Sequence, residues 1–302
     1  MQTFYSHGKL LISAEYAVLD SALALALPTK FGQSLSVESN SENTILWKSI
    51  SNEGIVWFEA VFKIDATLKI STSNSSDIAI RLLQVLEALQ LLNPTLFKVH
   101  NGYVLTSTLE FPENWGLGSS STLINNLAQW AQVDAFKLLE LTFGGSGFDI
   151  ACAQEDSGIL YQLKEGEPTV KIVKFSPPFI ESLFFVHRNQ KQNSRDGIAY
   201  YKTLTADQSP DFYELNSLTL ELLNCTDLKT FESLIEQHER YISTLIQQPP
   251  LKEAMFSDYE GAIKSLGAWG GDFFLATGNA DAMAYFKSKG YSTVVPFLEM
   301  IL

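Results

Sequence analysis

A glycine-serine segment in front of a helical pattern is the feature that most constrains the fold of this chain. Residues 112–121 read Pro-Glu-Asn-Trp-Gly-Leu-Gly-Ser-Ser-Ser. Glycines let the backbone curl so that several N–H groups point to one place, and a helix start adds its positive end there. The segment is therefore predicted to hold phosphate. Its predicted contact residues are Gly116, Leu117, Gly118, Ser119, Ser120 and Ser121.

The elements around this segment are predicted to be strand, loop and helix. Residues 103–109 alternate and contain β-branched and aromatic side chains, which is typical of a strand. After the serines, one helical face collects Leu123, Ile124, Leu127, Trp130 and Ala131, and other faces receive Asn125, Asn126 and Gln129. Serine is a frequent N-cap, so an ordinary serine-capped helix after a glycine turn is the alternative that this segment leaves open.

Three other segments decide between these interpretations. Residues 6–20 contain Gly8-Lys9 and then Glu15, residues 144–151 read Gly-Gly-Ser-Gly-Phe-Asp-Ile-Ala, and residues 267–272 read Gly-Ala-Trp-Gly-Gly-Asp. Together with the loop at 112–121, they resemble in order the signatures of the GHMP kinases, the superfamily of galactokinase, homoserine kinase, mevalonate kinase and phosphomevalonate kinase. The resemblance covers almost the whole chain.

The periodicity by itself indicates an α+β chain. Helices are expected over 76–92, 211–248 and 252–266, and strands over 158–163, 170–175, 183–187, 273–277 and 291–295. The resemblance implies the two-domain GHMP kinase architecture, with a ribosomal S5-like N-terminal domain, a ferredoxin-like C-terminal domain and an active site in the cleft between them. Ser176-Pro177-Pro178 is the preferred boundary, which gives domains at 1–176 and 177–302.

The resemblance also implies the catalytic groups. Asp149 matches the aspartate that serves as the base in mevalonate kinase-like sequences, and Lys9 resembles the lysine beside it. A cation there would keep the aspartate ionised and attract a phosphate or hydroxyl. The alternatives are that Asp149 only caps a helix starting at Ile150 and that Lys9 is only solvated.

ATP and Mg²⁺ are the expected cofactors. Gly270 and Gly271 of the C-terminal turn are predicted to approach the phosphates, although that turn could simply join two elements. Mg²⁺ prefers oxygen ligands, and Ser120 and Glu140 are the candidates. Glu140 lies closer to Asp149 than the metal-binding glutamate does in typical mevalonate kinases, so a solvated helix-surface glutamate is the alternative.

The substrate side rests on two segments. Glu15 and Tyr16 stand where mevalonate kinases usually have Glu-His and phosphomevalonate kinases often have Glu-Tyr, while Ala14 departs from both patterns. Residues 187–196 gather three cations in a chain that has few. The residues predicted to grip an anionic substrate are Glu15, Tyr16, Lys191, Ser194 and Arg195. A polar surface turn is the alternative for the second segment.

Composition restricts the partners. The net charge of −13 over 302 residues argues against nucleic-acid or anionic-membrane binding, because both need clustered Lys and Arg. The chain has no basic-then-apolar leader and no apolar run of the ~18 residues that a bilayer span needs, so a cytoplasmic monomer or homodimer is expected. Cys152 and Cys225 are isolated and are predicted to be reduced.

Three functions fit these observations. The first is an ATP-dependent kinase of a small anionic metabolite, mevalonate or phosphomevalonate before homoserine or a sugar. The second is a diphosphomevalonate decarboxylase-like lyase, which would have the same fold and also use ATP. The third is a non-catalytic binding protein, which would be expected to have lost either the lysine or the aspartate. Both residues are present.

Overall fold

The computed structural model describes residues 1–98, 102–190, 194–206, 210–269 and 271–302. The chain forms two compact units that are interleaved in sequence. Unit 1 comprises residues 1–8, 31–113 and 118–154, and unit 2 comprises residues 9–30, 114–117 and 155–302. The mixture of helices and strands confirms the α+β class. The boundary between domains at residue 176 stays a prediction.

Unit 1 contains a mixed sheet with the strand order β5-β4-β3-β6-β2. Its strands are β3 (Thr44–Ile50), β4 (Val56–Ile64), β5 (Ile70–Ser71), β6 (Gly102–Leu109) and residues 31–40 of β2 (Ala24–Asn40). β3 and β6 are parallel, whereas the other neighbours are antiparallel. β1 (Gln2–Leu11) pairs with β2. The predicted strand over 103–109 is therefore confirmed.

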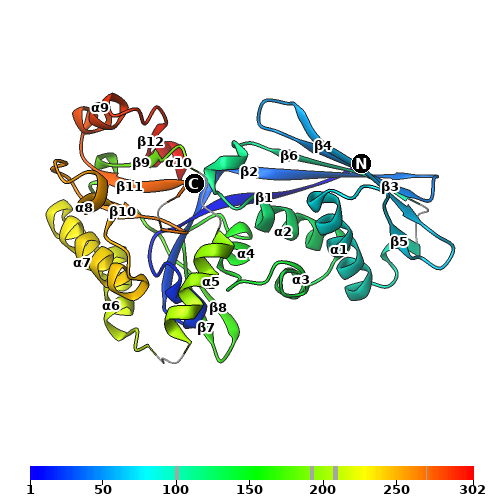
Figure 1. Cartoon of the computed structure of the whole chain (residues 1–302), viewed down its shortest axis with the longest axis horizontal. Coiled ribbons are helices and arrows are strands. Elements are labelled where there is room, and N and C mark those ends of the chain that lie inside the picture. The colour runs from blue at the N-terminus through cyan, green and yellow to red at the C-terminus, as the bar shows by residue number, and fades with distance from the viewer. Residues whose placement is uncertain (99–101, 191–193, 207–209, 270) are drawn as a thin grey trace. The chain divides into compact units, whose positions relative to one another are not determined.

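Helices of unit 1 pack on one face of this sheet (Figure 1). They are α1 (Asp77–Leu92), α2 (Ser119–Ala131), α3 (Ala135–Thr142) and α4 (Phe148–Ala153), with the short 3-10 turn η2 (Leu96–Lys98). A further 3-10 turn, η3 (Glu113–Trp115), begins at the last residue of the 31–113 stretch of unit 1 and continues into residues 114–117 of unit 2. Trp47 and Phe62 from the strands meet Leu86 and Leu127 from the helices in one core. The Ser76 hydroxyl caps α1 by accepting from the Ala79 N–H at 3.3 Å, which confirms the predicted start of that helix.

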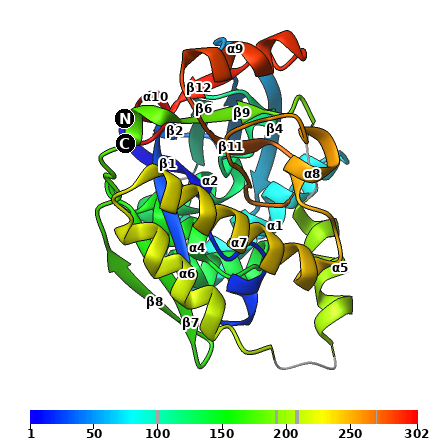
Figure 2. The ribbon, with the colours of Figure 1, turned by 90° about the vertical axis from the view of Figure 1, so that its left-hand side faces the viewer.

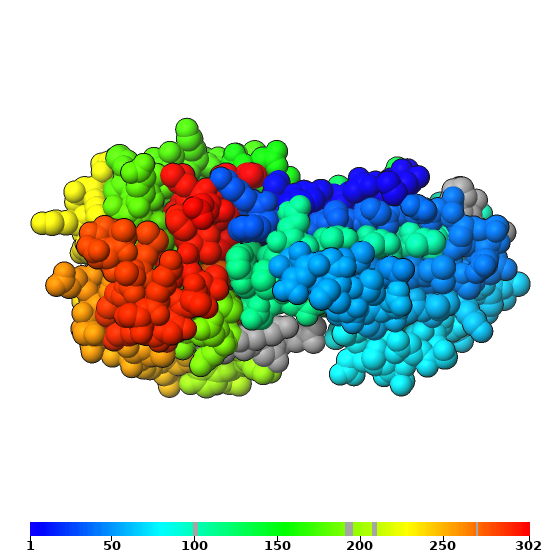
Figure 3. Space-filling view, turned by 90° about the horizontal axis from the view of Figure 1, so that it is seen from above, coloured from blue at the N-terminus to red at the C-terminus, as the bar shows by residue number. Residues whose placement is uncertain are grey.

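On the opposite face of the unit 1 sheet, the strands themselves form the surface, which Figure 3 shows from above in blue and blue-green. Side chains on β3 and β4 alternate between buried and exposed positions, as expected for a sheet covered on one face. Leu46, Val56, Trp57 and Val61 are the large apolar side chains of these strands that remain exposed.

Unit 2 contains an antiparallel sheet with the order β10-β11-β9-β12. The strands are β9 (Leu183–His187), β10 (Ile263–Ser265), β11 (Phe273–Thr277) and β12 (Val294–Pro296). In the same unit, β7 (Ile159–Lys164) pairs with β8 (Glu167–Ile172) and with residues 24–26 of β2.

The helices of unit 2 include two long ones, α6 and α7, which lie side by side (Figure 2). The helices are α5 (Ser194–Thr205), α6 (Tyr213–Asn224), α7 (Leu228–Ile246), α8 (Leu251–Met255), α9 (Ala280–Ser288) and α10 (Phe297–Met300), with the 3-10 turns η1 (Ala17–Asp20) and η4 (Ile180–Ser182). α7 also packs on β10, so its inner face reaches the small sheet.

Several predicted elements need correction. The helix expected over 252–266 is wrong, because α8 ends at Met255 and residues 263–265 form β10. All three side chains of β10 are buried, and the strand pairs with β11. A helix with one apolar face could not bury three consecutive side chains. The expected helix over 211–248 is interrupted at 225–227, and the strand expected over 170–175 lies at 167–172.

Candidate functional site

The start of α2 in unit 1 differs from the serine-capped helix that we considered. The N-cap is Gly118, in the left-handed region at φ 89°, and it receives no side-chain cap. The first three N–H groups of α2 belong to Ser119, Ser120 and Ser121 and have no partner within the helix by its geometry. The Ser121 hydroxyl donates to the Gly118 carbonyl at 2.9 Å, whereas the Ser120 side chain is exposed.

Two buried asparagines fix α2 in unit 1. The Asn126 side-chain oxygen accepts from the Ser6 hydroxyl at 2.7 Å, and its nitrogen donates to the Gln33 carbonyl at 2.8 Å. The Asn125 amide donates to Ser6 Oγ at 2.9 Å and accepts from the Gln154 amide, also at 2.9 Å. The expectation that both asparagines lie off the buried face is wrong. Each has its hydrogen-bonding atoms paired, which offsets the cost of burial.

This network ties α4 to α2, because Gln154 is the C-cap of α4. Asp149 lies in the first turn of α4 and is half-buried. The N-cap of α4 is Gly147, at φ 86°, so the alternative that Asp149 caps this helix is wrong.

Lys9 contacts the predicted phosphate loop within unit 2. Its ammonium group donates to the Gly116 carbonyl at 3.3 Å, and its backbone N–H donates to the Leu117 carbonyl at 3.0 Å. The strand that carries the lysine is therefore joined to the loop by both backbone and side chain. The alternative of an entirely solvated Lys9 is wrong, because the side chain is half-buried.

Residues 114–117 also pack on the small sheet of unit 2. The Trp115 ring meets the Phe273 ring edge to face at 5.3 Å between centroids. His187 Nε2 lies 2.9 Å from the Asn114 carbonyl oxygen, which assigns the Nε2 proton as the donor. β9 and β11 thus hold the first half of the predicted loop.

Asp272 brings the C-terminal glycine turn close to residues 114–117. A Cβ added at Gly116 would lie 2.1 Å from Asp272 Oδ2, and Gly116 has φ 64°, so two independent constraints require glycine there. The Asp272 carbonyl accepts from the Arg188 N–H at 2.7 Å, and its N–H donates to the Gln190 carbonyl at 3.0 Å. Residues 114–117, 188–190 and 271–272 therefore meet within unit 2.

The other predicted residues are placed separately. Lys191 and Gly270 lie outside the described residues. Ser194 and Arg195 begin α5, and Gly271 is buried directly before Asp272. Glu140 is exposed on α3, in the same unit as Ser120 and Asp149. Lys9 belongs to unit 2, so its predicted pairing with Asp149 of unit 1 stays a prediction.

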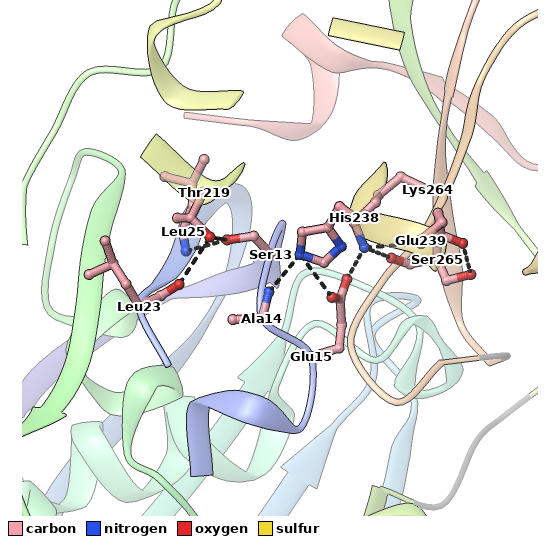
Figure 4. A network of polar contacts seen from close by, with 10 residues as sticks. All are labelled: Ser13, Ala14, Glu15, Leu23, Leu25, Thr219, His238, Glu239, Lys264 and Ser265. Carbon is pink, nitrogen blue, oxygen red and sulfur yellow. Dashed lines mark hydrogen bonds and ion pairs between the residues drawn. The ribbon is translucent and has the colours of Figure 1, made fainter. Parts of the chain in front are cut away.

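Glu15 and Tyr16 are almost completely buried in unit 2. The Glu15 carboxylate is ion-paired with Lys264 on β10 (Figure 4). The Tyr16 hydroxyl donates to the Ala268 carbonyl at 2.7 Å, and its ring stacks on Tyr201 at 5.7 Å. Direct substrate contact by Glu15 and Tyr16 stays a prediction that these contacts do not favour.

Lys264 is shared by two carboxylates. Its ammonium also lies 3.2 Å from Glu239 Oε1 on α7 and donates to the Ser265 carbonyl at 2.6 Å. Glu239 accepts from the Ser265 N–H at 3.0 Å and from the Ser265 hydroxyl at 2.9 Å. Sequence reasoning missed this cluster. The one signal in the sequence is Lys264 itself, because a lysine next to the apolar Ile263 is unusual in a buried strand.

His238 completes the cluster as a neutral group. The Ala14 N–H donates to His238 Nε2 at 3.0 Å, so the ring proton is assigned to Nδ1. Burial, assisted by the nearby Lys264, lowers the pKa of His238 well below its usual value. Burial raises the pKa of Glu15 to about 7 against the opposing effect of Lys264, and burial also raises the pKa of Glu239. The two carboxyl groups therefore bind a proton more readily than exposed carboxylates would.

The described residues contain no group of three or more His, Cys, Asp or Glu side chains placed to hold a metal ion. Within the same residues, no helix combines the length and apolar character that crossing a bilayer requires. Among the described residues, neither Cys152 nor Cys225 takes part in a disulfide.

The fold is that of the GHMP kinases, which confirms the predicted resemblance at the level of structure. Mevalonate kinase from Methanococcus jannaschii matches with a TM-score of 0.68 at 13% identity, covering 97% of this chain and 96% of that chain. Phosphomevalonate kinase from Streptococcus pneumoniae, in complex with phosphomevalonate and AMPPNP, matches with a TM-score of 0.68 at 15% identity, covering 100% and 98%.

A third match has a different chemistry. A mevalonate diphosphate decarboxylase from Legionella pneumophila matches with a TM-score of 0.58 at 13% identity, covering 97% of this chain and 99% of that chain. No protein-family model and no curated protein sequence matches the chain. Because these identities are low, the comparisons establish the fold and leave the reaction to the residues of the site.

The buried Glu15 carboxyl makes stability depend on pH. Its pKa is higher in the folded chain than in the unfolded chain, so its stabilising contribution is complete at low pH and is lost as the pH rises through about 7. We expect the unfolding midpoint of the wild type, relative to that of Glu15→Gln, to fall by several degrees between about pH 5 and pH 8. Differential scanning calorimetry at both pH values measures it.

Comparing the wild type with Glu15→Gln removes the contribution of His238 to the pH dependence of stability. That contribution has the opposite sign. Its lowered pKa means that its stabilising contribution is lost as the pH falls below the unfolded value. Glu236→Gln on the outer part of α7 is the matched control and should show no such trend. A constant difference between wild type and Glu15→Gln would contradict the assigned charge state.

Proposed function

We propose that this protein is an ATP-dependent kinase that transfers the γ-phosphoryl group to a hydroxyl or phosphate of a small anionic metabolite. Mevalonate and phosphomevalonate are the first candidates for the acceptor. The contact between Lys9 and the Gly116 carbonyl, at 3.3 Å, carries this proposal. It joins two of the sequence signatures in space, which a chance match of short motifs would not require.

The phosphates of ATP would be bound largely by backbone groups. The N–H groups at the start of α2 have no helical partner and no side-chain cap, and the helix dipole favours an anion there. Lys9 adds a cation next to the first half of the loop. In a chain with a net charge of −13, such local groups must overcome the repulsion of the whole protein for ATP.

Asp149 is proposed to accept the proton of the acceptor hydroxyl as that oxygen attacks the γ-phosphorus. Phosphoryl transfer depends mainly on positioning and neutralisation of charge, so a single carboxylate is enough for the acid-base part. The Gln154–Asn125 hydrogen bond holds the helix that carries Asp149 against α2. The lysine and the aspartate are proposed to lie on either side of the reacting group.

Mg²⁺ fits the donors that unit 1 offers. Ser120 provides a hydroxyl and Glu140 a carboxylate, both on exposed side chains, and Mg²⁺ is commonly held by few protein oxygens together with water and substrate phosphates. We propose that these two residues hold the ion. When bound, Mg²⁺ would neutralise charge on the β- and γ-phosphates.

The acceptor is proposed to be recognised by the segment that leads into α5. Lys191, Ser194 and Arg195 lie there, directly after residues 188–190, which hydrogen-bond Asp272. Cations in this place would bind the carboxylate or phosphate of a small metabolite. Homoserine and sugar kinases stay as alternatives in this class, because no described contact selects one acceptor.

A decarboxylase-like lyase is the second candidate function. The match to the Legionella pneumophila enzyme favours it, since that protein has the same fold over nearly the whole chain. Such an enzyme would release CO₂ from its substrate, whereas a kinase would release only ADP and a phosphorylated product. The two functions therefore differ in an easily measured product.

The roles of Lys9 and Asp149 can be tested by substitution. Lys9→Met removes the cation beside the loop and Asp149→Asn removes the proposed base, so each should lower turnover by about 100-fold or more. ADP release measures the effect, and circular dichroism checks the fold.

Lys30→Met is the control for the lysine, because Lys30 also donates to a backbone carbonyl, that of Leu298 at 2.7 Å. Asp77→Asn is the control for the aspartate, since Asp77 also lies in the first turn of a helix. Near wild-type turnover in Lys9→Met or Asp149→Asn would overturn the proposed roles.

The acceptor is tested by an ADP-release screen of the wild type. Mevalonate, phosphomevalonate, homoserine and galactose are supplied separately with Mg-ATP, and ³¹P NMR identifies the product. We expect mevalonate or phosphomevalonate to stimulate ADP release without CO₂. Release of CO₂ from diphosphomevalonate would instead establish the lyase.

Charge reversal tests the anion-binding segment. Lys191→Glu with Arg195→Glu should raise the KM for the acceptor about tenfold or more and change the KM for ATP much less, because two attractive charges become repulsive. Lys202→Glu, an exposed reversal in the last turn of α5, is the control. Equal acceptor KM values in the double variant and the wild type would reject this assignment.

A further inference from the structure

We propose that Lys264 is a positioning residue that fixes two segments of the ATP site with respect to each other. The segments are residues 9–16, which contain Lys9, and the described residues 266–269 and 271–272 of the C-terminal glycine turn. This inference rests on the proposed function for its kinetic consequence. Its structural content, that one buried ammonium holds both segments, stands independently of that function.

Lys264 touches both segments. It lies at the centre of β10, it is 1% exposed, and its ammonium binds the Glu15 carboxylate of the first segment. The same ammonium lies 5.7 Å from the centre of the Trp269 ring in the glycine turn, within the range of a cation–π contact. A lysine buried to this degree must have partners for its charge, and here they come from both segments.

A second link runs parallel to the lysine. The Tyr16 hydroxyl donates to the Ala268 carbonyl at 2.7 Å, so the residue after Glu15 is bound to the residue before Trp269. A Cβ at Gly197 would lie 2.3 Å from the Tyr16 hydroxyl, so α5 approaches this link closely. The ion pair and the hydrogen bond together give the turn two attachments to residues 14–16.

The backbone in both segments needs such attachments. Ala14 and Tyr16 have φ angles of 62° and 60°, and Trp269 and Asp272 have 44° and 47°. Residues other than glycine are strained in this region, typically by about 1 kcal/mol or more each, and keep it only where surrounding contacts require it. The Ala14 N–H bond to His238 supplies one such contact, and the Glu15–Lys264 pair supplies the next.

Glu239, the second carboxylate, holds Lys264 in place independently of Glu15. Glu239 contacts the ammonium at 3.2 Å and binds Ser265 through both its oxygens, so α7 anchors β10 directly before the glycine turn. Lys264 is thus held from α7 while it holds Glu15. Lys264 thus links residues 9–16 to the rigid helix α7.

A role in stability alone is the competing explanation. A buried ion pair is expensive to desolvate, and replacing both partners by neutral groups is often nearly neutral for stability. This makes the double variant Glu15→Gln/Lys264→Met informative. It removes one negative and one positive charge, so the cluster keeps its net charge, but the ion pair that joins the two segments is gone.

Hydrogen exchange of the double variant is the first measurement. We expect amide exchange in residues 9–17 and 266–272 to accelerate about tenfold or more, with α6 and β9 unchanged, because the two substitutions remove only local interactions. Uniform acceleration across unit 2 would indicate loss of stability alone, and unchanged exchange would mean that the lysine positions nothing. Either result overturns the proposal.

Kinetics of the same variant is the second measurement. We expect the KM for ATP to rise and kcat to fall, each about tenfold or more, because displaced phosphate-binding segments misalign the reacting groups. The KM for the acceptor should change less. A purely structural role would leave these constants as in the wild type for the folded fraction, which would contradict the positioning role.

Thr219→Val is the matched control. Thr219 is fully buried on α6, and its hydroxyl lies 2.9 Å from Ser13 Oγ and 3.0 Å from the Leu23 carbonyl, next to the same cluster (Figure 4). It contacts the first segment but not the glycine turn. The variant should lower the unfolding midpoint without changing local exchange at 266–272 or the KM for ATP.

The two hypotheses fail in different ways. If the wild type neither binds Mg-ATP nor releases ADP with any acceptor, the proposed function fails, and the exchange experiment still tests the lysine. If the wild type is an active kinase and the double variant retains both its local exchange and its KM for ATP, the positioning role fails while the kinase stands.

Discussion

One buried lysine organises the part of unit 2 on which the proposed site depends. Lys264 lies between Glu15 and Glu239, and these side chains come from three separate parts of the chain. The attraction between an ammonium and a carboxylate is strong where water is excluded, but so is the cost of leaving either charge alone. The cluster therefore enforces one arrangement of its three segments, because an arrangement that separates the charges leaves them unpaired in the core.

That arrangement brings short, glycine-containing segments together. The loop at 114–117 is held by Phe273 and His187 of the small sheet, and Asp272 lies so close to Gly116 that no side chain fits there. Lys9 reaches the same loop from β1. In unit 1, the asparagines of α2 fix the helix start and the short helix that carries Asp149. Lys9 and the helix that carries Asp149 are thus each held by polar contacts with neighbouring segments.

The sequence predicted the repeating parts of the fold well. Amphipathic α1, with its serine cap, and the alternating strand β6 follow from local patterns. The sequence could not predict that β10 would replace part of a helix, since this strand depends on its pairing with β11. Lys264 illustrates the limit, because its burial is favourable only with Glu15 and Glu239, which no local pattern connects to it. The roles of the site residues stay predictions.

Thermal unfolding of a double-mutant cycle at pH 7.5 tests the lysine cluster most directly. Lys264→Met alone leaves Glu15 and Glu239 buried together without a cation, whereas adding Glu15→Gln removes one of the two unpaired carboxylates. The account predicts that the double variant unfolds at a higher temperature than Lys264→Met, so the second substitution rescues the first. The account is contradicted if the double variant is less stable than Lys264→Met by as much as Glu15→Gln destabilises the wild type.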